Sequence, residues 1–247
     1  MRINPGKCVG CGQCRVFCPM GCIAFTRKDK GGQIQCRINE DECVDCEVCL
    51  RANACPTDAL EQPPAAWPRS VRGTFSNPLI THKETKVPGR GTEEIKTNDV
   101  TNRYKCGYVG ISAELGRPVL GARLRDAERV FMVLAPLAVE FEKQNPLTSL
   151  LADPATGKLK EDVLGEKVLS CIVETIAPIE RAAEILDALD KVAGEIESVF
   201  SVDLISRVEE DLSIPALEML KREKRSYALN GKINIGLGRL CIKGADC

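Results

Sequence analysis

CVGCGQCRVFCP at residues 8–19 and CVDCEVCLRANACP at residues 43–56 are the two stretches that decide the fold of this chain. In each, three cysteines are spaced by two residues and a fourth is followed by proline, giving C-x2-C-x2-C-x3-C-P and C-x2-C-x2-C-x5-C-P. Three thiolates in one turn, with a fourth supplied from elsewhere in the chain, suit the corners of an iron-sulfur cube. We therefore predict that the chain carries electrons through iron-sulfur clusters.

Two other uses of these cysteines are weaker. A secreted disulfide framework needs an oxidising compartment, and the N-terminal residues MRINPGKC contain no apolar signal segment. Zinc sites normally use paired C-x2-C knuckles, which a third thiolate at the same spacing fits poorly. Clusters remain the preferred interpretation, with zinc as the main alternative.

Composition excludes several classes of protein. The formal net charge of the 247 residues is -1, which gives no reason to expect nucleic acid or an anionic membrane surface as partner. No apolar run approaches the length of a membrane span. Many unpaired cysteines need a reducing interior, so we expect a cytoplasmic protein from an anaerobic or microaerobic cell.

The chain divides into three predicted parts. Residues 1–62 repeat internally, because Ile3-Asn4 and Ile38-Asn39 each stand five residues before the first cysteine of a run. In this repeat Cys22 occupies the position of Ala59, so it is interpreted as a small buried residue, as is Cys36. Residues 63–105 are interrupted by prolines and glycines and carry excess positive charge. They predict an irregular basic arm, docked on a partner or on the rest of the chain.

Residues 106–247 predict an α+β domain. Residues 168–176 are β-branched and indicate a strand, followed by a helix over 179–193 that Pro178 opens. Residues 200–208 alternate as a half-buried strand, a shorter helix begins near Ser213, and residues 232–237 indicate a closing strand. We expect a small sheet with helices on one side, of the split βαβ type.

The first cysteine run resembles that of the two-cluster bacterial ferredoxins, in which the fourth cysteine of each run ligates the other run's cluster. The resemblance implies a ferredoxin-like module with two 4Fe-4S clusters. Carried over residue by residue, it assigns one cluster to Cys8, Cys11, Cys14 and Cys55, and the other to Cys43, Cys46, Cys49 and Cys18.

The stretch PGRGTEEIKTNDVT (residues 88–101) is a candidate anion-binding loop. Its glycine-freed amides and its cationic and hydroxyl side chains suit an anion, and the candidate residues are Arg90, Gly91, Thr92 and Lys96. A solvated turn leading into a helix explains the same residues equally well. The order of residues is not that of a phosphate loop, so nucleotide hydrolysis is not supported.

With YKCGYVGI (residues 104–111) and GRPVLGAR (residues 116–123), this stretch resembles the ferredoxin-bearing region of 6-hydroxynicotinate reductase and its relatives, over residues 1 to about 135. Such reductases pair clusters with a flavin to reduce a heteroaromatic ring. The chain lacks the larger C-terminal portion of that family, so the resemblance implies an electron-delivery part. No flavin or nicotinamide fingerprint supports a flavin here, because position 241 is Cys where G-x-G-x-x-G needs glycine.

The remaining reactive residues have plain interpretations. Cys106, Cys241 and Cys247 with Cys22 or Cys36 would supply a third cluster, but scattered cysteines are more often core residues or a free tail thiol. His82, the one histidine, would serve as a proton donor, although an exposed loop histidine is the simpler interpretation.

Three functions follow from these patterns. The leading one is low-potential electron transfer as a subunit or dedicated donor of an anaerobic reductase, with a redox protein as partner. The second is a reductase acting directly on a carboxylate- or thioester-bearing aromatic substrate. The third is reductive sulfur transfer or cofactor assembly involving Cys106 or Cys247.

Overall fold

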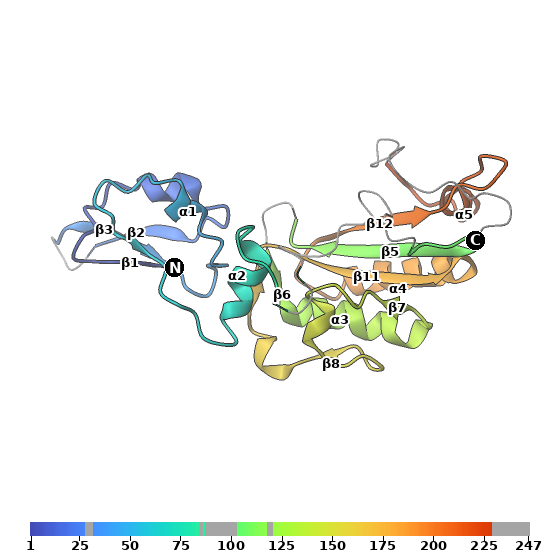
Figure 1. Cartoon of the computed structure of the whole chain (residues 1–247). Helices are drawn as coiled ribbons and strands as arrows, with labels where there is room; N and C mark the ends of the chain where they lie inside the picture. Colours follow the sequence, from blue (N-terminus) through green and yellow to red (C-terminus); the bar gives the residue numbers. More distant parts are fainter. Residues whose placement is uncertain (28–31, 84–85, 87–102, 118–120, 229–247) are drawn as a thin grey trace.

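The computed structural model describes residues 1–27, 32–83, 86, 103–117 and 121–228. Figure 1 shows a small cysteine-rich module at one end of the molecule and a larger α/β part at the other. The short helix α2 (Ser70–Ser76) lies between them. Each part has a hydrophobic core of its own, and α2 contributes Val71 and Phe75 to the core of the larger part.

The N-terminal module is built from two short antiparallel strand pairs. Strand β1 (Arg2–Ile3) pairs with β4 (Leu60–Glu61), and β2 (Ile23–Arg27) pairs with β3 (Ile34–Ile38). A 3-10 turn, η1 (Gln13–Phe17), follows the first cysteine loop, and a one-turn helix, α1 (Val48–Arg51), follows the second. Most of the buried residues in this module are cysteines, so little apolar core remains without them.

The internal repeat extends to the backbone. Gly10 and Gly12 in the first loop have φ angles of 70° and 74°, and the equivalent Asp45 and Glu47 have φ angles of 51° and 59°. Glycine adopts this left-handed conformation freely, whereas other residues pay about 1 kcal/mol for it. The second loop therefore keeps the backbone path of the first at an energetic cost.

The C-terminal part is a four-stranded antiparallel sheet in the order β12-β5-β11-β7. Strand β5 (Tyr108–Leu115) is followed by α3 (Leu124–Leu134) and the edge strand β7 (Glu140–Phe141). Strand β11 (Cys171–Pro178) is followed by α4 (Ala182–Ala193) and β12 (Phe200–Ser206), and α5 (Pro215–Arg222) comes after β12. Because β5 and β7 both pair antiparallel with β11, they run parallel, with β11 inserted between them. This is the connectivity of a split βαβ unit.

Shorter elements complete the C-terminal part. Strand β6 (Ala122–Arg123) pairs with β10 (Lys167–Val168), and β8 (Leu151–Asp153) pairs with β9 (Lys158–Leu159). The 3-10 turns are η3 (Ala135–Leu137), η4 (Thr148–Leu150), η5 (Glu161–Val163) and η6 (Ile179–Arg181). The β6-β10 pair lies beside α2 and faces the N-terminal module.

The two faces of the central sheet differ in polarity. Helices α3 and α4 pack against each other and cover the face formed by Val109, Ile111 and Leu115. The opposite face carries the buried polar residues Ser112, Glu114 and Glu174. Strand alternation explains the division, since odd-numbered residues of β5 point to the helices and even-numbered residues point away.

Several sequence predictions hold in the C-terminal part. The strand expected over 168–176 is β11, the helix expected over 179–193 contains α4, and the strand expected over 200–208 contains β12. Strand β5 and helix α3 were not predicted, and the arm expected to be irregular over 63–105 contains helix α2. The closing strand expected over 232–237 lies outside the described residues. Among the residues that the structure describes, no helix is long and apolar enough to cross a membrane.

Candidate functional site

Two thiol-lined pockets occupy the N-terminal module. The first is lined by Cys8, Cys11, Cys14, Cys36 and Cys55. The second is lined by Cys18, Cys22, Cys43, Cys46 and Cys49. Each pocket thus combines three cysteines of one run with the last cysteine of the other, which is the crossed grouping that the ferredoxin resemblance implies.

Backbone amides already point at the sulfur atoms. The amide of Ala59 donates a hydrogen bond to Cys55 Sγ at 3.2 Å, and the amide of Cys36 donates to Cys8 Sγ at 3.4 Å. Amide hydrogen bonds to ligand sulfur stabilise negative charge and raise the reduction potential of a cluster. The first pocket is therefore preorganised for anionic sulfur.

Burial opposes ionisation of at least one candidate ligand thiol in each pocket. Burial raises the pKa of Cys14 to about 12 and the pKa of Cys49 to about 11. Four neighbouring thiolates need positive charge between them, which the iron of a cluster supplies. Within the described residues, no three histidine, cysteine or acidic side chains converge closely enough to hold one metal ion. Four cysteines in the crossed grouping line each pocket, which is the number of ligands that a 4Fe-4S cluster takes.

Each pocket also contains a fifth thiol. Cys22 Sγ lies 3.4 Å from Cys18 Sγ, and its hydrogen bond lowers the pKa of Cys18 to about 6. Cys36 lines the first pocket next to Cys8. Both residues are buried, as expected from the repeat, but their contact with the candidate ligands was not anticipated. The repeat gave no signal for it, because Ala59 and Met1 stand at the equivalent positions.

The two pockets differ in how far they are covered. Val9 is 51% exposed and Cys11 is exposed, whereas the equivalent Val44 is 1% exposed and Cys46 is 8% exposed. The cover of the second loop comes from the α2 region. Arg72 on α2 is buried and donates to the carbonyl oxygen of Cys43 at 2.8 Å.

Asp45, inside the second loop, anchors both chain segments around it. Its carboxylate accepts hydrogen bonds from the N-terminal ammonium at 2.5 Å and from Arg69 at 2.9 Å. Burial alone raises the pKa of Asp45, but the hydrogen bonds from these two cations outweigh burial and lower it. The paired carboxylate holds the left-handed turn of the loop in place.

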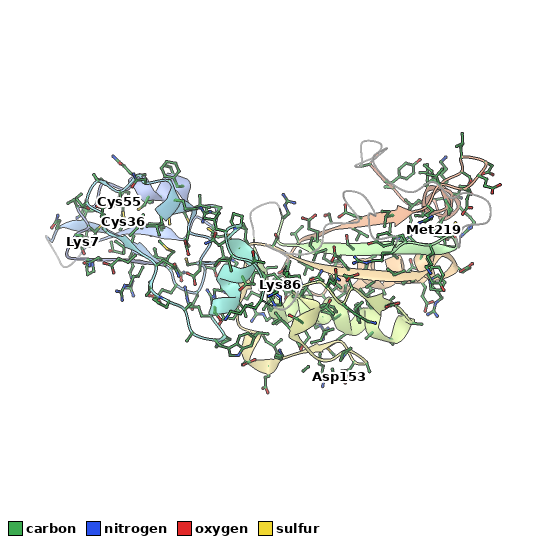
Figure 2. The ribbon with its side chains drawn as sticks, viewed as in Figure 1. Lys7, Cys36, Cys55, Lys86, Asp153 and Met219 are labelled. Atoms are coloured by element: carbon green, nitrogen blue, oxygen red, sulfur yellow. The ribbon has the colours of Figure 1, made fainter. Side chains whose placement is uncertain are left out.

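Ion pairs join the second half of the module to the C-terminal part. Glu42 contacts Arg123 at 3.0 Å and also pairs with Lys167, and Arg72 pairs with Glu166. Packing is equally close, since a Cβ at Gly121 would lie 2.8 Å from the terminal methyl of Met20, which lines the second pocket. The second pocket therefore faces the C-terminal part. Figure 2 places Cys36 and Cys55 of the first pocket in the half of the module that lies away from it.

The basic arm was expected to dock on a partner or on the rest of the chain, and these contacts are of the second kind. Arg69 and Arg72 make internal ion pairs with Asp45 and Glu166. His82 is half-buried, not exposed as expected, and its Nε2 lies 3.2 Å from Ser149 Oγ.

The other candidates remain predictions. Arg90, Gly91, Thr92 and Lys96 lie outside the described residues, as do Cys241 and Cys247 of the third cluster considered above. Cys106 is described and half-buried, but it lines neither thiol pocket. Cys22 and Cys36 line different pockets, so they do not share one site with each other.

Comparison with known proteins assigns the module. Residues 7–59 match the family described as 4Fe-4S dicluster domain. Ferredoxin-1 of Rhodobacter capsulatus is 38% identical over 71 residues, which cover 97% of that protein and 26% of this chain. An uncharacterized ferredoxin of Methanocaldococcus jannaschii is 39% identical over 58 residues, covering 70% of that protein and 24% of this chain. Pyruvate synthase subunit PorD of the same organism is 39% identical over 54 residues, covering 55% of PorD and 22% of this chain.

Proposed function

Since residues 7–59 make this chain a member of the 4Fe-4S dicluster ferredoxin family, we propose that it is the electron-transfer component of an anaerobic reductase, as a subunit or as a dedicated donor. The dicluster domain transfers electrons through two 4Fe-4S clusters. The observation that carries the proposal is the position of the second pocket, which is covered by α2 and faces the C-terminal part.

The residues of the chain have separable tasks in this role. The clusters supply one-electron redox chemistry. Cys8, Cys11, Cys14 and Cys55 would hold one cluster, and Cys43, Cys46, Cys49 and Cys18 would hold the other. Arg72 and the rest of α2 exclude water from the second loop. The amides of Cys36 and Ala59 donate hydrogen bonds to sulfur and so favour negative charge on the ligands of the first pocket.

Size supports a dedicated component over a free carrier. About a quarter of this chain spans almost the whole of Ferredoxin-1, so the remaining residues are not needed for electron transfer alone. The C-terminal part is joined to the module by the ion pairs of Glu42 with Arg123 and Lys167. PorD, a subunit of pyruvate synthase by its name, offers a parallel for a cluster-bearing part that serves a larger enzyme.

The finer proposal concerns the reaction that receives the electrons. The resemblance of residues 88–123 to the 6-hydroxynicotinate reductase group suggests a reductase of heteroaromatic rings, with the flavin on another subunit. A direct reductase within this chain would need cationic groups for its carboxylate-bearing substrate, and the candidate cations Arg90 and Lys96 lie outside the described residues. The two cysteine pockets support the relay, so the relay is the function we propose.

Metal and flavin content of the anaerobically purified chain tests the proposal. We expect about eight iron and about eight acid-labile sulfide per chain, with no flavin absorbance, because the eight cysteines hold two four-iron clusters. Reduction should produce two interacting one-electron EPR signals at low potential. Stoichiometric flavin in the pure chain would contradict the relay and favour the direct reductase. About twelve iron would reinstate a third cluster.

A further inference from the structure

Charge is divided sharply between the two halves of the module. Residues 1–37 contain the basic residues Arg2, Lys7, Arg15, Arg27, Lys28, Lys30 and Arg37 against the single acid Asp29. Residues 38–61 contain Glu40, Asp41, Glu42, Asp45, Glu47, Asp58 and Glu61 against the single base Arg51. The formal net charge of the whole chain, -1, conceals this division.

Much of the acidic half is used inside the molecule. Glu42 pairs with Arg123 and Lys167, and Asp45 pairs with Arg69. Backbone carbonyls of Glu40 and Asp41 accept hydrogen bonds from Arg72. The charge of this half therefore fixes the module to the C-terminal part and leaves the second pocket covered.

The basic half supplies most of the residues that line the first pocket and presents apolar side chains to solvent. Val9 is 51% exposed, Phe25 is 48% exposed and Ile34 is 43% exposed. These side chains adjoin the pocket, because Val9 lines it and the Phe25 ring lies within 2.5 Å of where a Cβ on Gly12 would be. A redox centre near a surface of this kind is accessible for electron transfer.

Arginines frame these apolar side chains. The Arg15 guanidinium lies over the Phe25 ring, 4.5 Å from its centroid. Arg27 is directly opposite Ile34 in the antiparallel β2-β3 hairpin. Arg2 and Lys7 lie beside Glu61, so their charge is partly balanced. We call the surface formed by Val9, Phe25, Ile34, Arg15 and Arg27 the first-pocket face.

We infer that the first-pocket face is the docking surface through which the chain receives electrons from an acidic redox protein. The inference rests on the proposed relay function and names the kind of partner that supplies it. An apolar centre with a charged rim is the usual composition of a protein interface, and positive charge around it selects an acidic partner. Electrons then pass from the first cluster to the covered second cluster and on to the C-terminal side.

Two inorganic oxidants of opposite charge test the electrostatic step. The fully reduced holoprotein is mixed in a stopped-flow apparatus with the trianion tris(oxalato)cobaltate(III) or with the trication hexaamminecobalt(III). At low salt, the anion should react at least about tenfold faster after correction for driving force, and salt should remove the difference. Equal salt dependence for the two oxidants would overturn the inference.

Charge-reversal variants localise the effect. The double variant Arg15→Glu, Arg27→Glu should react with the anionic oxidant about tenfold or more slowly than the wild type. Arg27→Glu alone should lower the rate by part of this factor. Lys191→Glu is the control, because Lys191 is an exposed cation on α4 in the C-terminal part, and its rates should stay within about twofold. An equal loss in the control would show that only net charge matters and would overturn the inference.

Two further measurements separate the causes of failure. Iron content and EPR spectra of every variant report whether the clusters are intact, so a loss of clusters is distinguished from a loss of docking. An acidic flavodoxin as protein acceptor should show the same dependence on Arg15 and Arg27 as the anionic oxidant. Sedimentation with phosphatidylserine vesicles should show no binding, and binding that depends on these arginines would replace the protein partner with a membrane.

Discussion

The thiol of Cys22 affects what we expect when the candidate ligand Cys18 is replaced. Crossed ligation predicts that Cys18→Ala disturbs the cluster of Cys43, Cys46 and Cys49, because Cys18 lines their pocket. Cys22 Sγ lies 3.4 Å from Cys18 Sγ, so its thiol is placed to take over as ligand. We expect Cys18→Ala to keep about eight iron with an altered EPR signal, and the double variant with Cys22→Ala to keep about four.

The matched control for this experiment is Cys171→Ala. Cys171 is a fully buried thiol of β11 in the C-terminal core, so its loss changes the thiol count without touching either pocket. Iron content should stay at the wild-type value. If Cys18→Ala instead alters only the signal of the cluster held by Cys8, Cys11 and Cys14, crossed ligation is wrong.

Arg72 carries a second prediction at this scale. Its guanidinium is buried, pairs with Glu166 and donates to the carbonyl oxygens of Glu40 and Cys43 at 2.8 Å each. Arg72→Ala leaves the carbonyl oxygen of buried Cys43 and the half-buried Glu166 carboxylate without this donor, so unfolding free energy should fall by about 3 kcal/mol in anaerobic denaturant titrations. Arg222→Ala, on the exposed side of α5, should change it by less than about 0.5 kcal/mol.

Helix α2 is the element that the sequence described least well. Its glycine, serines and flanking prolines lowered the helical signal, yet Val71 and Phe75 are buried in the C-terminal core. The stabilising contacts come from tertiary packing and from Arg72, which local periodicity does not report. The sequence shows the excess of basic residues in this segment, but it does not show that Arg69 and Arg72 pair with Asp45 and Glu166 inside the molecule.

Phe75 tests whether α2 protects the second cluster. Phe75→Ala should reduce unfolding free energy by about 3 kcal/mol and loosen α2 from the core, because the side chain is 3% exposed. Oxygen should then bleach the signal of the second cluster faster, while that of the first stays unchanged. Leu79→Ala, at a site 74% exposed, is the control and should alter neither signal.

Other elements were predictable to different degrees. The strands and helix over residues 171–206 followed from strong periodicity and from Pro178 at the helix start. Strand β5 was not predicted, although Val109, Ile111, Ala113 and Leu115 alternate with less apolar residues as in a strand with one face on the core. It is the central strand that pairs with both β11 and β12. The cysteine spacing indicated iron-sulfur clusters, and the crossed grouping of cysteines in the two pockets is the one that the resemblance to two-cluster ferredoxins implied.

At the scale of the whole molecule, the two cores are separate and unequal. The hydrophobic core of the module consists largely of cysteines. The C-terminal core contains Phe131, Leu115 and other fully buried apolar side chains. We therefore expect the clusters to supply much of the folding free energy of the module and little of that of the sheet.

Removal of the clusters should unfold one part and spare the other. After anaerobic treatment with a chelator and an oxidant, limited proteolysis should cleave residues 1–62 rapidly and leave a fragment containing the C-terminal sheet. Circular dichroism should retain the signal of α3 and α4. Resistance of residues 1–62 to protease would show that the module folds without its clusters.

The uneven covering of the two pockets also governs what happens when two copies of the chain meet. The second pocket of each copy is covered by Arg72 and the C-terminal part. Electron exchange between two copies therefore requires that their two first-pocket faces, each carrying Arg15 and Arg27, approach each other. Like charges oppose that encounter. Electrons should thus exchange slowly between identical molecules, and a reduced copy should stay reduced until it meets a different redox partner.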